Sequence, residues 1–151
     1  MTRRAPLNRL LARTRARLPR LRPRQVSRAF DNGALLVDIR PEYQRRADGE
    51  VPGAVVIERN HLEWRLHPSS ADRILEATDV HIKWIVMCDE GYASSLAAAT
   101  LRAIGLRATI DLAGGFQAWR AAGLPVVRRS TLMPPRLASG DDRYERRRPR
   151  R

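Results

Sequence analysis

The sequence predicts an α/β fold in which a parallel sheet of about five strands carries helices on both faces. Short apolar runs alternate with helical patterns through the middle of the chain, as in strand-helix-strand units. The length of 151 residues is that of one domain, and 43% of the residues are hydrophobic, which is enough for a core. No apolar run is long enough for a membrane span or a secretory signal, so we expect a cytoplasmic protein without a transmembrane segment.

The first half of the predicted domain alternates helix and strand. Residues 24–32, closed by Gly33, have the pattern of a helix with a glycine C-cap. The apolar run at 34–39 predicts a buried strand. Pro52 and Gly53 predict a turn, which leads into a second strand at 54–57.

The second half continues the alternation around its glycines. Gly105 is expected to end a long alanine-rich helix, and Gly114 with Gly115 to turn the chain into the last helix. In order, we expect helical turns at 62–66 and 71–77, a strand at 82–87, a helix at 94–104, a strand at 108–112 and a helix at 116–122.

The formal net charge of +13 comes from the two ends of the chain. Residues 1–28 contain ten arginines and no acidic residue, while residues 29–127 contain ten basic and thirteen acidic residues. We therefore expect a basic, partly helical or flexible segment at 1–22, a domain at 23–128, and a disordered basic tail at 129–151. Arginine clusters of this kind attract nucleic acid or anionic membranes weakly and without specificity. Lysine is nearly absent, a bias that indicates GC-rich coding and a bacterial source.

Cys88 is the only cysteine, so the chain can form neither an internal disulfide nor a cysteine-rich zinc site. The predicted strand at 82–87 delivers this residue to its carboxyl end, where α/β proteins bind ligands. Backbone amides of the following loop and the next helix N-terminus would stabilise an anionic sulfur there. Gly91 allows the loop to close tightly, and Ser94 or Ser95 is expected to cap the helix. The placement favours a nucleophile over a buried packing residue.

Four separate blocks, in order, resemble the rhodanese-like domain family between residues 25 and 127. The cysteine loop has the family's spacing of cysteine, two residues, glycine, two residues and serine. Glu50 stands where histidine is usual, and we expect it to pair with Arg40 or Arg59. The other blocks are LLVDIR at 35–40 followed by Glu42 and Tyr43, GEVPGA at 49–54, and LAGGFQAWRAAGLPV at 112–126.

The resemblance implies a sulfurtransferase that carries sulfane sulfur on Cys88 as a persulfide. Thiosulfate or a persulfide, small or protein-borne, would donate the sulfur, and a thiol or cyanide would accept it. Asp38 and Arg40 are expected to support the site. No cofactor or metal is implied, and the three histidines His61, His67 and His81 lack a metal-ligand spacing. The implied substrate-binding loop comprises Asp89, Glu90, Gly91, Tyr92, Ala93 and Ser94.

The loop is acidic where thiosulfate-using members usually carry basic residues. Asp89 and Glu90 beside the cysteine would repel a dianionic donor; pointing outward, they would form an acidic rim for a cationic or protein-borne partner. The alternative function is a non-catalytic binding or redox-sensing module. A cysteine phosphatase would need a longer loop ending in arginine, and the sixth residue after Cys88 is Ser94.

Overall fold

The computed structural model describes residues 5–128 and contains one five-stranded parallel sheet. The strand order is β1-β5-β4-β2-β3. The expected tail at 129–151 lies outside the described residues. The strands are β1 (Arg20–Leu21), β2 (Leu35–Asp38), β3 (Val55–Val56), β4 (Trp84–Met87) and β5 (Ile110–Leu112).

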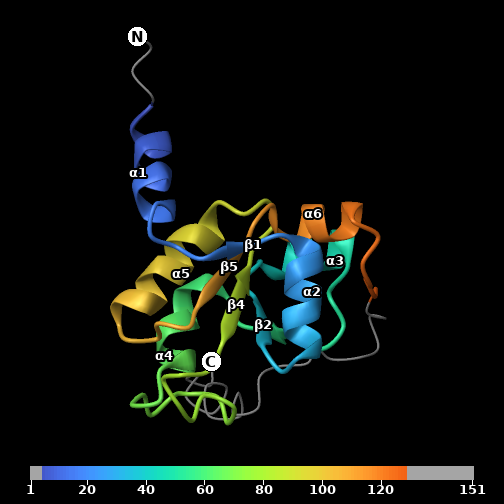
Figure 1. Ribbon diagram of the computed structural model, residues 1–151. Coiled ribbons are helices and arrows are strands. Elements are labelled where there is room, and N and C mark those ends of the chain that lie inside the picture. Colours follow the sequence, from blue (N-terminus) through green and yellow to red (C-terminus); the bar gives the residue numbers. More distant parts are fainter. Residues whose placement is uncertain (1–4, 129–151) are drawn as a thin grey trace, which may run out of the picture.

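Helices cover both faces of this sheet, as the sequence predicts (Figure 1). One face carries α1, α4 and α5, and the opposite face carries α2, α3 and α6. The helices are α1 (Pro6–Arg15), α2 (Pro23–Asp31), α3 (Glu42–Asp48), α4 (Leu62–Leu66), α5 (Ala93–Ala103) and α6 (Gly115–Ala121), with a 3-10 turn at Arg59–His61 before α4. No helix in the described part of the chain is long and apolar enough to cross a membrane.

The central strand β4 shows why the sheet is buried on both sides. Its four residues are fully buried, and successive side chains point to opposite faces. Trp84 and Val86 belong to the core under α4 and α5, whereas Ile85 and Met87 belong to the core under α2 and α6. Cys88 follows in the same alternation and joins the core on the α5 side.

The N-terminal basic segment contains a strand that the sequence pattern does not predict. β1 is the edge strand of the sheet, and it pairs in parallel with β5. The helix before it, α1, packs beside α5, and Leu11 and Leu18 are buried. A strand of two residues has no hydrophobic period that a sequence pattern can detect.

Two further segments differ from the sequence prediction. The helix α3 is not predicted, although its first residues, Glu42 and Tyr43, belong to one of the blocks that resemble the family. The segment 71–77, expected to form helical turns, forms non-helical turns instead. Its Ile74 and Ala77 are nevertheless fully buried, so apolar residues at near-helical spacing here reflect contact with the core rather than a helix.

Candidate active site

Two backbone amides of the cysteine loop, residues 88–94, point at the Cys88 sulfur. The N–H of Gly91 donates to Sγ at an N···S distance of 3.1 Å, and the N–H of Ser94 donates at 3.3 Å. Ser94 lies in the first turn of α5, so the positive end of that helix also faces the sulfur. Cys88 is 7% exposed. The expected amide cradle for an anionic sulfur is therefore present.

Close contact with α6 determines the shape of this loop. A Cβ atom on Gly115 would lie 2.6 Å from the carbonyl oxygens of both Cys88 and Asp89, so only glycine fits. The N–H groups of Phe116 and Gln117 donate to the same two carbonyls at 2.8 and 3.0 Å. Because α6 binds these loop carbonyls, they are directed away from the sulfur.

Ser94 and Ser95 do not cap α5, which corrects the sequence prediction. The N-cap residue is Tyr92, and it makes no side-chain capping bond. The hydroxyls of Ser94 and Ser95 instead donate to the two oxygens of Asp111, at 2.5 and 2.6 Å. Asp111 lies on β5 and is fully buried, so its carboxylate needs such donors.

An open pocket of about 540 Å³ leads to Cys88. On one side it is lined by loop residues, on the other by the end of β2 and the start of α3, where Tyr43 and Gln44 lie. Arg40 and Arg59 line it as well, so two basic and two acidic residues border the pocket. The loop residues in the lining are Cys88, Asp89, Glu90, Tyr92 and Ala93.

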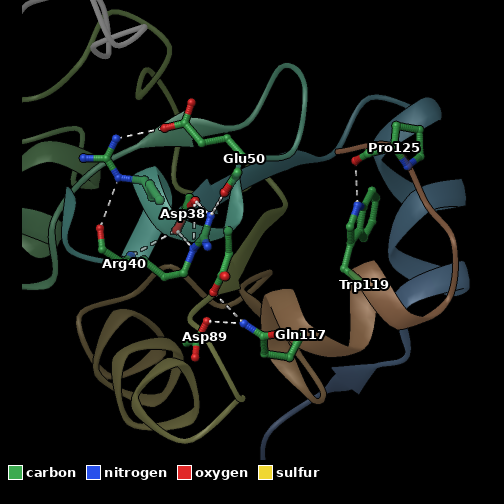
Figure 2. A network of polar contacts seen from close by, with 10 residues as sticks. Asp38, Arg40, Glu50, Asp89, Gln117, Trp119 and Pro125 are labelled. Atoms are coloured by element: carbon green, nitrogen blue, oxygen red, sulfur yellow. Dashed lines mark hydrogen bonds and ion pairs between the residues drawn. The ribbon is translucent and has the colours of Figure 1, made fainter. Parts of the chain in front are cut away.

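The structure separates the two acidic residues of the loop. Asp89 is half-buried and accepts a hydrogen bond of 2.9 Å from Gln117 Nε2, as Figure 2 shows. The same amide also donates to Asp48 at 3.0 Å. Glu90 is exposed. Both line the pocket, but only Asp89 is held by a neighbouring helix, so the outward acidic rim consists of Glu90.

Asp38 and Arg40 form a fully buried ion pair beneath the pocket, with 2.8 Å between Arg40 Nη2 and Asp38 Oδ2. The guanidinium also donates to the carbonyl of Gly49 and lies 3.8 Å from the centroid of the Phe116 ring. It thereby connects β2, the turn after α3, and α6. Figure 2 shows the pairing of Arg40 with Asp38. Asp38 does not line the pocket, whereas Arg40 does.

The structure also shows the ion-pair partner of Glu50 and the positions of the three histidines. Glu50 pairs with Arg45 at 2.8 Å rather than with Arg40 or Arg59. Arg59 instead pairs with Glu63, four residues further along. His61, His67 and His81 lie outside the pocket lining, and the described residues contain no group of three or more side chains arranged to hold a metal ion.

Three residues that sequence reasoning missed contact the loop or its support. Arg15 on α1 donates to the Gly91 carbonyl and to Ser95 Oγ, and Arg20 on β1 forms an ion pair with Asp111. Nothing in the sequence distinguishes these arginines from the other six in the basic segment at 1–22. Asp111 did carry a signal, because a charged residue inside a short apolar strand requires a buried partner.

Comparisons with known proteins agree with this geometry. The profile of the Rhodanese-like domain family matches residues 22–122. Over 102 residues, the chain is 37% identical to the thiosulfate sulfurtransferase GlpE of Ectopseudomonas mendocina and 36% identical to that of Pseudomonas aeruginosa. Each alignment covers 68% of this chain and 84% of the relative.

Solved structures share the fold over most of the chain. A protein of unknown function from Rhodopseudomonas palustris, a possible tyrosine phosphatase, superposes with a TM-score of 0.73 at 27% identity. That alignment covers 84% of this chain and 98% of the other. The polysulfide-sulfur transferase of Wolinella succinogenes superposes with a TM-score of 0.65 at 23% identity, covering 83% of this chain and 90% of that one.

Proposed function

Since the chain belongs to the rhodanese-like domain family and is a sulfurtransferase, we propose that Cys88 carries the transferred sulfur as a persulfide. The observation that carries this proposal is the pair of amides from Gly91 and Ser94 directed at Cys88 Sγ. Two fixed N–H donors stabilise a thiolate before the reaction and would stabilise charge on the persulfide after it. Water molecules would have to reorient before they could stabilise the same charge, whereas these amides are already in position.

The first half-reaction forms the persulfide. The Cys88 thiolate attacks the sulfane sulfur of the donor, a new S–S bond forms, and the donor's bond to that sulfur breaks. With thiosulfate the leaving group is sulfite, which takes the bonding electron pair; with a persulfide donor it is a thiolate. No net oxidant is consumed, because the sulfane sulfur simply changes its partner.

The second half-reaction returns the enzyme to its starting state. A nucleophilic acceptor, a thiolate or cyanide, attacks the outer sulfur of the Cys88 persulfide. The S–S bond breaks, and its electron pair returns to Cys88 as the thiolate that Gly91 and Ser94 stabilise. The pocket walls formed by Tyr43 and Tyr92 would admit the acceptor to that sulfur. A reactive free thiol of this kind suits a reducing compartment, which supports a bacterial cytoplasm as the location of the protein.

The pocket charges favour a persulfide over thiosulfate as the donor. Arg40 is neutralised by Asp38, and Arg59 by Glu63, whereas Glu90 forms no ion pair within residues 5–128. A dianionic donor would approach this unbalanced carboxylate at a cost. A donor of lower charge, such as a small or protein-borne persulfide, avoids that repulsion.

The geometry does not favour phosphatase chemistry. Catalysis by a cysteine phosphatase needs an arginine at the end of the loop to hold the phosphoryl oxygens. Ser94 occupies that position here, and its hydroxyl is already bonded to Asp111. A persulfide needs only amide donors, which the loop supplies.

Intact-mass analysis tests the proposal directly. The reduced protein is incubated with thiosulfate, and separately with a low-molecular-weight persulfide, and is then treated with cyanide or a thiol. We expect a gain of one sulfur atom on Cys88 with the persulfide donor, reversed by the acceptor. If neither donor adds sulfur while Cys88 remains reduced and open to alkylation, the persulfide mechanism is wrong and a binding or redox-sensing module takes its place.

A further inference from the structure

We propose that Arg15 is a positioning residue for sulfur transfer, which it serves by holding the cysteine loop from outside. Arg15 lies at the end of α1, before the stretch of chain that matches the family profile. The proposal rests on the proposed function of Cys88. It assigns to the basic N-terminal segment a role at the active site rather than at an anionic surface.

Arg15 binds the loop and the start of α5 through two nitrogens of its guanidinium group. Nη2 donates to the carbonyl oxygen of Gly91 at 2.7 Å, and Nε donates to Ser95 Oγ at 3.0 Å. The guanidinium carbon also lies 5.7 Å from the centroid of the Tyr92 ring, which is within cation-π range. One side chain thus contacts three residues of the loop and the first turn of α5.

The Gly91 contact is the one that bears on the sulfur. The N–H of Gly91 donates to Cys88 Sγ, while the carbonyl of the same residue accepts from Arg15. Because a trans peptide points its C=O and the following N–H in opposite directions, holding this carbonyl toward Arg15 also directs the N–H of Tyr92 away from Arg15. Arg15 therefore restrains the peptide between Gly91 and Tyr92, which adjoins the peptide whose N–H donates from Gly91 to Cys88 Sγ.

The Ser95 contact joins Arg15 to the buried support of the loop. A serine hydroxyl has one hydrogen to donate. Ser95 Oγ lies 2.6 Å from Asp111 Oδ2 and 3.1 Å from the Gly91 carbonyl, so the shorter, charge-assisted bond to the carboxylate takes that hydrogen. Gly91 then needs another donor for its carbonyl, and Arg15 supplies it.

Arg20 also binds Asp111, the carboxylate that accepts the hydrogen bond from Ser95. Its Nε donates to Asp111 Oδ2 at 2.8 Å, and its side chain is 25% exposed while that of Asp111 is fully buried. Both arginines are therefore linked to the buried carboxylate of Asp111, Arg15 through the hydroxyl of Ser95 and Arg20 directly.

The test compares Arg15→Ala with Arg13→Ala, which removes one arginine from an exposed position of the same helix. We expect Arg15→Ala to slow persulfide formation about tenfold, because moving a catalytic group by a fraction of an ångström lowers the rate of the chemical step. The rate of persulfide formation by Arg13→Ala should stay within about twofold of that of the unmodified protein, because this substitution should not displace the catalytic group. The rate for Arg15→Lys should lie between those of the two alanine variants, because lysine keeps a donor for Gly91 but lacks the paired N–H donors of the guanidinium group.

Amide hydrogen exchange gives a second measurement that is independent of turnover. Exchange at Gly91, Tyr92 and Ser94 should accelerate in Arg15→Ala and remain unchanged in Arg13→Ala. Equal rates and equal exchange in the two variants would overturn the proposal. Should Arg15→Ala fail to fold, Arg15→Lys carries the same comparison.

The outcomes separate this inference from the proposed function. If the unmodified protein takes up sulfur and Arg15→Ala does so equally fast, the positioning role is wrong and the persulfide mechanism stands. If the unmodified protein takes up no sulfur although Arg15→Ala loosens the loop, the role of Arg15 in sulfur transfer falls together with the mechanism.

Discussion

The hydroxyl of Ser94 donates a hydrogen bond of 2.5 Å to Oδ1 of Asp111, a carboxylate with no exposure to solvent. The backbone N–H of the same serine points at Cys88 Sγ. One residue therefore joins the buried carboxylate on β5 to the sulfur at the end of β4. This connection couples the position of the Ser94 amide to the neighbouring strand.

Replacement of Asp111 by asparagine should destabilise the protein by about 1–3 kcal/mol, because two serine hydroxyls and Arg20 lose a charged acceptor. The midpoint of urea unfolding measures the change. As a control, Glu42→Gln removes an exposed carboxylate that pairs with Arg46 on α3, and it should cost less than about 0.5 kcal/mol. Equal midpoints for the two variants would contradict a structural role for Asp111.

Cys88→Ser should fold normally and lose sulfur transfer completely. The amides of Gly91 and Ser94 can donate to a serine oxygen, so we expect the free energy of unfolding to change by less than about 1 kcal/mol. Activity disappears because an alcohol is not ionised at neutral pH and forms no persulfide. Intact mass after donor treatment measures the outcome, and sulfur uptake by this variant would place the carrier atom elsewhere.

Gly115→Ala should displace the cysteine loop, because its Cβ would lie 2.6 Å from two loop carbonyls. Gly123→Ala is the matched control, since Gly123 also has a positive φ, of 72°, but nothing within 4 Å of a Cβ. We expect a cost of about 1 kcal/mol for Gly123→Ala from backbone strain alone. Gly115→Ala should cost about 3 kcal/mol through added overpacking.

Sulfur transfer distinguishes these two glycine variants further. Gly123→Ala should retain the activity of the unmodified protein, while Gly115→Ala should lose most of it even at temperatures where it remains folded. Rates are compared below the unfolding transition of each variant. Full activity in Gly115→Ala would mean that the loop tolerates the displacement and that its contact with α6 is not needed.

Removing negative charge at the pocket should improve the use of thiosulfate. Glu90→Gln keeps the side-chain shape and removes one charge, and we expect kcat/KM for thiosulfate to rise about threefold. The pair Asp89→Arg and Glu90→Ser should raise it about tenfold. A persulfide donor of lower charge is the internal control, and an equal gain with both donors would argue against electrostatic repulsion.

Deletion of residues 129–151 should weaken salt-sensitive binding to nucleic acid without altering sulfur transfer. This segment contains eight arginines and three acidic residues. The slope of log affinity against log salt concentration should fall by about 0.7 for each phosphate of a single strand that the shortened protein no longer neutralises. Fluorescence polarisation with a labelled oligonucleotide measures it, and an unchanged slope would exclude the tail as the anion-binding segment.

A matching deletion at the N-terminus has a different expected result. Removal of residues 1–22 also removes β1, Arg15 and Arg20, so it takes away the edge strand and the cation beside Asp111. We therefore expect such a truncation to lower both stability and sulfur transfer. Both ends are rich in arginine, and within residues 5–128 the N-terminal segment supplies groups that hold the cysteine loop and its support.

The fold and the position of Cys88 followed from local patterns in the sequence. The buried strand before Cys88, the glycine of the loop and the alanine-rich helix after it each have their signal within a few residues. Short-range sterics and hydrophobic periodicity act at that range, so the sequence alone predicts the parallel sheet and the position of Cys88 at the carboxyl end of a central strand. The boundaries of these elements agree with the structure to within about two residues, which is the usual limit of such patterns.

Tertiary structure alone decided which polar groups support that cysteine. Ten arginines with similar local sequence precede residue 29, and only packing of α1 and β1 selects Arg15 and Arg20 as partners of Gly91 and Asp111. In the same way, contact with Gln117 holds Asp89 while Glu90 remains exposed. A buried carboxylate must find its donors wherever the chain brings them, and those donors lie up to 91 residues away in sequence.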